Sequence, residues 1–503
     1  MAETARKQMI EVPRFADNPR SRLLMTFIGG WVIVAIVLAG MFQTGSQYRA
    51  DSTMMRLAQV MVCYGLCSGI ALVVSRFALS KSWSDGLGYV LMGAMTVAGI
   101  GMAVNLSGYC QFPGTFDNPY FGNAYDFEME WQRIVVYKAT GDFIRGTNIG
   151  FTYIASLAVD RMGPGIAGLL MLNVVFMCGT VAVTSRIATV LLPDSNRKKT
   201  SLYAAIAIAS VASVIWYATV PLKESGVTFA FTLFALSIAK LYRGNVGVSG
   251  IVAAALGGFL LMMLKGSLGW LLVPGIIIAW LPIGKERKVA AMGPLYSSII
   301  LMLIAGSVIM GGRNFRFIKD EVLVGAVESQ REGMEDYMTS YSTVQKYKQL
   351  IPDYFIQSPA QRLLQLPLTA SAQYFPPFPW NYLRDKDEGR FVWYAHLSIF
   401  WYILGGAAIG YVVLCIWRQK ARGGLGWWAL WGGICYLAIA YYSGGTVARY
   451  YLPFIPCFVP LALRMVQCAR RKLISPVIVK IYCCAYVAVM AVALTLAFNF
   501  LNT

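Results

Sequence analysis

Gly247-Val-Ser-Gly-Ile-Val-Ala-Ala-Ala-Leu-Gly-Gly-Phe-Leu-Leu-Met-Met-Leu264 is an apolar stretch of 18 residues without a charged side chain. An α-helix of that length crosses most of the hydrocarbon core of a membrane. Similar apolar runs recur near residues 23–42, 57–77, 86–106, 165–184, 202–220, 226–241, 268–283, 293–310, 393–416, 425–442, 451–466 and 476–500. The sequence therefore predicts an all-α, polytopic integral membrane bundle of about 13 transmembrane helices.

The composition agrees with a membrane protein. Hydrophobic residues make up 57% of the 503 positions and charged residues only 13%, whereas soluble domains are about 25% charged. Membrane segments then alternate with two large loops. We expect a tail at 1–22, three helices in 23–106, a first loop at 107–164, helices four to nine in 165–310, a second loop at 311–392 and helices ten to thirteen in 393–503.

The Lys and Arg residues orient this bundle. With the N-terminus in the cytoplasm, 23 of them fall on the inner side and 19 on the outer side, ten of these in the second loop. Loops longer than about 60 residues are exempt from the positive-inside rule. Without the second loop, 23 Lys and Arg residues lie on the inner side and 9 on the outer side. We expect the N-terminus in the cytoplasm and the two large loops on the outer face of the membrane. Cations facing anionic headgroups also explain the net charge of +19 without nucleic acid.

The acids follow a different distribution. On this topology 18 of the 24 Asp and Glu residues lie on the outer side, most of them in the two loops. Acids contribute little to orientation, so the positive-inside rule does not require this asymmetry. Polar chemistry gathered in loops on one face favours an enzyme acting on lipid-linked substrates at the membrane surface over a pore.

The first loop contains a candidate catalytic segment. Hydrophobic residues recur within Asp126–Lys138 at a spacing typical of an amphipathic helix lying along the membrane surface. On that helix Asp126 and Glu130 share a face, with Glu128 between them in the chain. A carboxylate at a low-dielectric boundary suits a general base, so Asp126 and Glu130 are catalytic candidates. Alternatively, these acids solvate the helix and pair with Arg133 and Lys138.

After this helix, residues 140–163 are apolar but too short and interrupted to span, and we expect them to re-enter against the bundle.

Several cations recur on the same predicted face. They suit a phosphate or pyrophosphate group, and arginine binds phosphate bidentately. The alternative is that each merely anchors the chain at the headgroup layer. Together with Glu128, the candidate substrate-binding residues are Lys223, Glu224, Lys265, Arg384, Arg449 and Tyr450.

These motifs occur in a recognisable order: the acidic helix, the Pro221-Leu-Lys-Glu224 turn, Lys265, a Pro-Phe-Pro379-Trp380 stretch and Arg449-Tyr-Tyr-Leu-Pro453. The chain from about residue 107 resembles the C-type (GT-C) polytopic membrane glycosyltransferases, specifically bacterial members similar to protein O-mannosyltransferases. The resemblance implies transfer of a sugar from a polyprenyl-phosphate carrier on the outer face. It also implies that an Asp of the first loop, best matched by Asp126 and then by Asp117, acts as the base.

Two departures from that family are visible. The acidic loop follows the third predicted span, whereas the family usually carries it after the first. The Tyr and Ala that usually follow the Asp are also not at the expected spacing.

Two other functions stay open at this point. One is an oligosaccharide repeat-unit polymerase or ligase that uses outer-face arginines, and the other is a transporter or flippase for lipid-linked glycans. Against transport, the predicted spans carry almost no buried charge. No cofactor is required; a divalent cation is compatible but unsupported, because His396 is the only histidine. The expected partners are a polyprenyl-linked donor, a membrane-proximal acceptor and membrane lipids.

Overall fold

A computed structural model of the chain describes residues 87–88, 90–95, 97–99, 124–141, 149–161, 166–244, 246–265, 268, 300, 358–375, 392–414, 424–443 and 448–502. Every regular element within these ranges is a helix. Their bounds are α5 Ala124–Thr140, α6 Ile149–Arg161, α7 Ile166–Leu191, α8 Arg197–Ala209, α9 Ala212–Trp216, α10 Glu224–Tyr242, α11 Gly247–Leu264, α17 Pro359–Leu364, α18 Leu366–Tyr374, α20 Val392–Leu414, α21 Gly424–Ser443, the 3₁₀ helix η5 Ala448–Phe454, α22 Ile455–Arg470 and α23 Pro476–Asn502.

The all-α class is confirmed for these residues, and the chain has the character of a multi-pass membrane protein. Five described stretches are long and apolar enough to cross a membrane: Gly168–Leu191, Glu224–Tyr242, Gly247–Leu264, Tyr450–Arg470 and Pro476–Leu496. The full count of about 13 stays a prediction, because the expected spans near 23–42, 57–77, 268–283 and 293–310 lie outside the described residues, apart from single positions.

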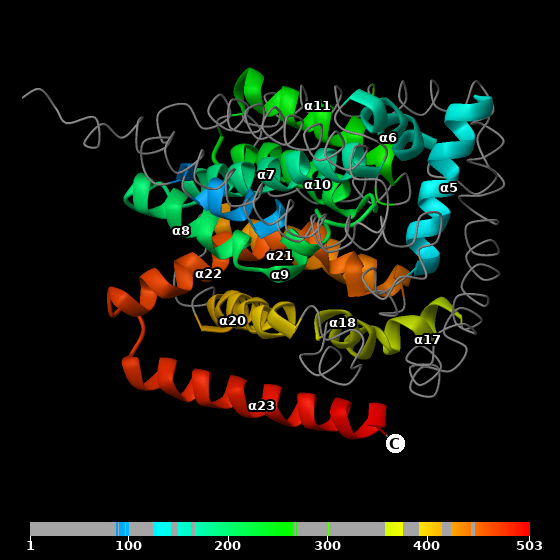
Figure 1. Ribbon diagram of the computed structural model, residues 1–503. Coiled ribbons are helices and arrows are strands. Elements are labelled where there is room, and N and C mark those ends of the chain that lie inside the picture. Colours follow the sequence, from blue (N-terminus) through cyan, green and yellow to red (C-terminus); the bar gives the residue numbers. More distant parts are fainter. Residues whose placement is uncertain are drawn as a thin grey trace, which may run out of the picture.

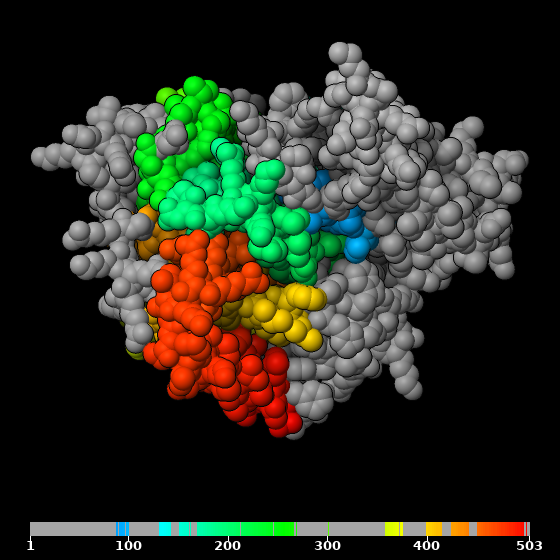
Figure 2. Space-filling model, turned by 90° about the vertical axis from the view of Figure 1, so that its left-hand side faces the viewer, coloured from blue at the N-terminus to red at the C-terminus, as the bar shows by residue number. Residues whose placement is uncertain are grey.

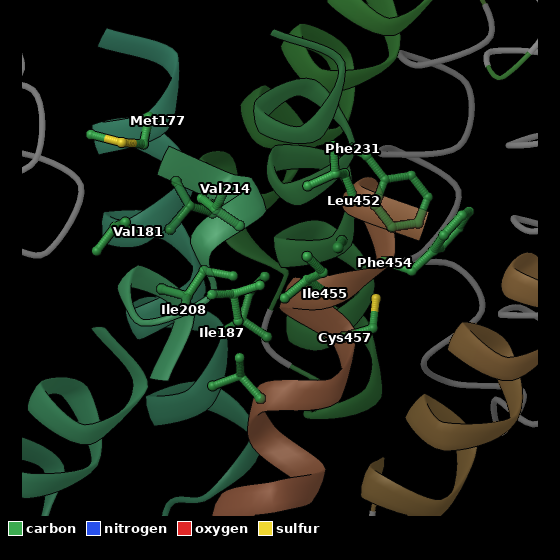
Figure 3. Close-up of a cluster of buried hydrophobic side chains, with 14 of the residues drawn as sticks. Met177, Val181, Ile187, Ile208, Val214, Phe231, Leu452, Phe454, Ile455 and Cys457 are labelled. Carbon is green, nitrogen blue, oxygen red and sulfur yellow. The ribbon is translucent and has the colours of Figure 1, made fainter. Parts of the chain in front are cut away.

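The long helices run side by side in one direction, and α5 lies across one end of them (Figure 1). Helix α10 is central and packs against α7, α11 and η5, while α20 packs against α22. Figure 3 shows side chains of α7, α8 and α9 pointing toward those of η5 and α22, where Ile208, Val214 and Ile455 are all at most 5% exposed. This part of the core therefore lies between helices α7, α8 and α9 on one side and η5 and α22 on the other.

One predicted span is wrong. The apolar run 202–220 is not a single helix, because α8 ends at Ala209 and the short α9 ends at Trp216. The break is stabilised from outside the segment, since the buried hydroxyls of Ser213 and Tyr451 hydrogen-bond at 2.8 Å. Apolar composition alone does not distinguish a continuous helix from a broken one whose polar groups find partners within the bundle.

Part of the second predicted loop is folded against the bundle. Helix α17 begins at a capping box formed by Ser358 and Gln361, and α18 packs on α21 and η5. Carbonyls at the end of α18 accept hydrogen bonds from other helices: Trp401 Nε1 donates to Tyr374 at 2.9 Å, and Tyr436 Oη donates to Ala370 at 2.8 Å. These donors fix the C-terminal end of α18 to α20 and α21.

The α10–α11 pair depends on close backbone approach. A Cβ added to Gly257 would lie 2.6 Å from the backbone nitrogen of Phe234 and 2.8 Å from the carbonyl oxygen of Ala230, whereas a Cβ added to Gly433 on α21 would meet no atom within 4 Å. Small residues commonly permit such contacts between membrane helices.

We predict that Gly257→Ala destabilises the protein by about 1–3 kcal/mol through overpacking. Gly433→Ala is the matched control and should be neutral or stabilise by about 0.5–1 kcal/mol, because alanine favours the helix. Thermal unfolding in detergent measures both variants. Equal melting temperatures for the two would contradict this packing.

Candidate functional site

Four segments distant in the sequence meet at one end of the bundle. Helices α10 and α11 are antiparallel neighbours, so the first residues of α10 lie beside the last residues of α11. A Cβ on Gly226 would accordingly lie 2.9 Å from Leu264 Cδ1. Helix α5 crosses this same end (Figure 1), and η5 packs against α10. The candidate site comprises α5, the turn 220–224, Lys265 and η5.

An ion pair joins the first loop to the bundle. Glu130, which is 5% exposed, places Oε1 3.0 Å from Lys223 Nζ and 3.2 Å from an Arg133 guanidinium nitrogen. Glu130 and Lys223 are 93 residues apart in sequence, and both were predicted site residues. The contact with Arg133 also matches the alternative in which the loop acids pair with nearby cations.

This geometry favours a positioning role for Glu130. A general base must be able to accept a proton from its substrate, whereas two neighbouring cations stabilise the ionised carboxylate. Glu130 holds the Lys223 ammonium in place and fixes α5 against the turn.

The turn that carries Lys223 is held by hydrogen bonds from α7. The buried Asn173 of α7 donates from Nδ2 to the carbonyl oxygens of Val220 at 2.8 Å and Leu222 at 2.9 Å. Glu224 then opens α10 and is 5% exposed, and an acid in the first turn interacts favourably with the helix dipole. The two charged residues of the turn therefore have a fixed backbone.

A second predicted pair also meets at this end. Lys265, the residue at which α11 ends, places its ammonium 3.4 Å from the centroid of the Tyr450 ring. Such a cation–π contact is attractive. The next residue, Tyr451, is 2% exposed and its ring stacks on Trp401 with centroids 5.1 Å apart. Tyr450 is therefore anchored through its neighbour.

The remaining predicted residues are placed only in part. Asp126 and Glu128 belong to α5, and Asp126 lies one helical turn before Glu130 on the same face; their side chains lie outside the described residues. Arg449 belongs to η5, directly before Tyr450, and its side chain is likewise not described. Asp117 and Arg384 fall outside the described ranges.

Asn173 is the residue at the candidate site that sequence reasoning missed. It lies within an apolar run, where a single amide resembles an ordinary packing position. The available signal was its polarity, because a polar side chain within a membrane segment commonly has a structural or functional partner. Its partners are backbone carbonyls, which no side-chain motif reveals.

Within the described part of the chain, no group of three or more His, Cys, Asp or Glu side chains is placed to hold a metal ion. Comparison with known proteins finds no matching protein-family model, curated protein or solved structure.

A double-mutant cycle tests the ion pair. We predict that Glu130→Gln lowers the free energy of unfolding by about 3–5 kcal/mol, because it removes the carboxylate from a buried pair. Lys223→Met should cost less, because Glu130 keeps Arg133. The double variant should cost clearly less than the sum of the single variants when unfolding is followed by tryptophan fluorescence. Strict additivity would contradict the pairing.

The turn has its own test. Asn173→Leu should lower the free energy of unfolding by about 1–3 kcal/mol for each carbonyl that loses its donor. It should also raise the rate of backbone amide hydrogen exchange in residues 218–224. Thr180→Val is the matched control on α7, because the Thr180 hydroxyl donates to the carbonyl oxygen of Phe176 within the same helix. Unchanged exchange in the Asn173 variant would show that the turn is held otherwise.

Proposed function

We propose that the protein is an integral membrane glycosyltransferase. It transfers a sugar from a polyprenyl-phosphate-linked donor to a lipid, glycan or protein acceptor on the outer face of the bacterial inner membrane. One observation carries this proposal: the Glu130–Lys223 ion pair joins the acidic helix of the first loop to the end of the bundle where Lys265 contacts Tyr450. A carboxylate helix and phosphate-binding cations beside a membrane bundle are what this reaction needs.

In this proposal Asp126 is the general base. It accepts the proton of an acceptor hydroxyl as that oxygen attacks the anomeric carbon of the donor sugar. The bond between the anomeric carbon and the phosphate oxygen breaks, and polyprenyl phosphate leaves with the electron pair. Asp126 suits this role better than Glu130 because Glu130 is occupied with Lys223 and Arg133.

The cations of the site then stabilise the leaving group. Polyprenyl phosphate gains negative charge as it departs, and a fixed cation lowers the energy of the transition state more than that of the ground state. Lys265 and Arg449 are assigned to the carrier phosphate. Lys223 adds positive potential and is held by Glu130, while Glu128, Glu224 and Tyr450 contribute to substrate binding.

The charges at the two ends of the bundle support the proposed orientation. The end opposite the site carries basic residues in and after α7, α10 and α22, among them Arg186, Arg197, Arg243, Arg464 and Arg471. Cytoplasmic ends of membrane helices are enriched in such residues. In this proposal the candidate site faces the outside, where lipid-linked sugars serve as donors.

Turnover in lipid nanodiscs tests the function. Purified protein is supplied with a radiolabelled pool of polyprenyl-phosphate sugars and lipid-pyrophosphate glycans. We predict transfer from the monosaccharide-phosphate donors, a loss of about 100-fold or more in Asp126→Asn, and a loss of at least tenfold in Arg449→Ala or Lys265→Ala. Lys199→Ala is the control, because it removes an exposed cation at the opposite end.

The other outcomes are equally defined. Turnover restricted to lipid-pyrophosphate glycans, unaffected by Asp126→Asn and lost in Arg449→Ala, would identify a polymerase or ligase. Movement of a lipid-linked glycan between leaflets without any transfer would identify a flippase. Either result would replace the transferase proposal.

A further inference from the structure

A second cluster of cations lies at the end of the bundle opposite the candidate site. It consists of Arg186 on α7, Arg197 at the start of α8 and Lys240 on α10, and the Lys240 ammonium donates to the hydroxyl of Ser249 on α11. Figure 2 views this end, where the surfaces of α8, α22 and the α10–α11 connection come together. Three helices and the start of a fourth thus converge on one basic position.

Neighbouring arginines at this end have acceptors in the protein. Arg243 donates from Nε to the carbonyl oxygen of Val190 at 3.1 Å and also reaches Leu191. Arg464 donates to Gln467 Oε1 and Arg471 to the carbonyl oxygen of Asp194, both at 3.4 Å. Carbonyls at a helix C-terminus favour cations, so Arg243 and Arg471 join the end of α7 to the ends of α10 and α22.

Arg186 differs from those arginines. No hydrogen bond or ion pair of its guanidinium is found within the described part of the chain, although the side chain is partly buried. Because Arg243 bonds to the carbonyl oxygens of Val190 and Leu191, the last turns of α7 and α10 lie against each other. Arg186 lies one turn before Val190, and Lys240 lies about one turn before Arg243, so these two like charges occupy adjoining turns, where they repel one another. Arg197 begins α8, which also packs against α7.

Repelling cations in a partly buried position are energetically costly. Membrane orientation does not require this arrangement, because cations in the connecting loops satisfy the positive-inside rule equally well. Arg186 and Lys240 instead lie within the apolar stretches Gly168–Leu191 and Glu224–Tyr242, near their ends. An anion bound between them would turn the repulsion into attraction.

We propose that Arg186, Lys240 and Ser249 form a binding site for the phosphate group of an anionic lipid headgroup in the leaflet at this end of the bundle. The guanidinium offers a bidentate contact to two phosphate oxygens, and the ammonium and the hydroxyl complete the set of donors. Arg197, exposed at the rim, adds to the positive potential. The site is separate from the candidate catalytic end and does not depend on the proposed function.

The position of the site favours a lipid over free phosphate. Arg186 precedes the end of its apolar stretch at Leu191 by five residues, which is about 8 Å along a helix axis. Its long side chain can bring the guanidinium back to the headgroup layer. Lipid phosphates occupy that layer, and basic positions between helix ends on the cytoplasmic side are suited to acidic headgroups.

The test measures the melting temperature of the intact protein in neutral detergent. Phosphatidylglycerol, phosphatidylcholine or inorganic phosphate is added in separate titrations, and unfolding is followed by tryptophan fluorescence. A ligand that binds only the folded protein raises the melting temperature with concentration. We expect phosphatidylglycerol to raise that of the wild type by several degrees more than phosphatidylcholine does, and inorganic phosphate to have little effect.

Variants test whether the phosphatidylglycerol effect depends on this site. Arg186→Met and Lys240→Met should lose at least about half of the phosphatidylglycerol effect, whereas Lys199→Met, an exposed cation on α8, should keep it. Because removing one cation relieves repulsion, neither site variant should melt below the wild type without added lipid. Arg186→Lys keeps the charge but loses the bidentate contact, and it should fall between the wild type and Arg186→Met.

Two results would overturn the proposal. A full phosphatidylglycerol effect in both site variants would assign it to general surface charge. An equal effect of inorganic phosphate in the wild type would assign the site to a free anion. Native mass spectrometry of retained phosphatidylglycerol provides a second measurement should a Met variant fold poorly, and retention by Arg186→Lys equal to that of the wild type would likewise contradict a bidentate contact.

Discussion

Backbone polar groups inside a membrane bundle need partners within the protein, because hydrocarbon offers none. This chain interrupts its helices after α9, at η5 and at the end of α18, and at each interruption the structure supplies specific partners. At the turn before α10, the Asn173 side chain donates hydrogen bonds to two backbone carbonyls. Trp401 donates to the carbonyl oxygen of Tyr374, the last residue of α18. The hydroxyls of Ser213 and Tyr451 bond to each other and so join α9 to η5. The irregular segments can therefore lie against the bundle without leaving these groups unsatisfied.

The candidate site is built from these interruptions. A continuous helix would carry Lys223 along a regular helical face, whereas the turn before α10 presents it to Glu130 on α5. In the same way, η5 places Tyr450 against the end of α11 and Lys265. Burying a charge near hydrocarbon costs free energy, and a fixed partner of opposite charge offsets that cost. A site for a charged substrate also needs charges that are held in place. At the other end of the bundle, Arg243 bonds to the last carbonyls of α7, and Arg471 bonds to the carbonyl of Asp194.

Sequence patterns predicted the regular parts of the fold well. The amphipathic helix expected within Asp126–Lys138 is α5, the uncharged stretch Gly247–Leu264 is α11 to the residue, and the interrupted segment after α5 contains the short α6 packed on α7 and α11. These features depend on local periodicity and length, which a sequence displays directly. The break at Ser210–Val211 and the docking of α18 were not predicted. They depend on contacts with residues far away in the chain, such as Tyr451 and Tyr436.

The candidate site was predictable to a similar extent. Residue types and the shared outer face identified Glu130, Lys223, Lys265 and Tyr450, and the structure brings them together as two contacting pairs. Sequence alone did not say which residue contacts which, so Glu130 was grouped with the candidate bases although its geometry favours positioning. We propose that this end of the bundle binds the phosphate of a lipid carrier. The most direct test is a cryo-electron microscopy structure in nanodiscs with a non-hydrolysable polyprenyl-phosphate sugar. We expect the carrier phosphate within ion-pair distance of Lys265, Arg449 or Lys223, with the sugar toward α5; an ordered carrier phosphate bound elsewhere, with this end empty, would contradict the account.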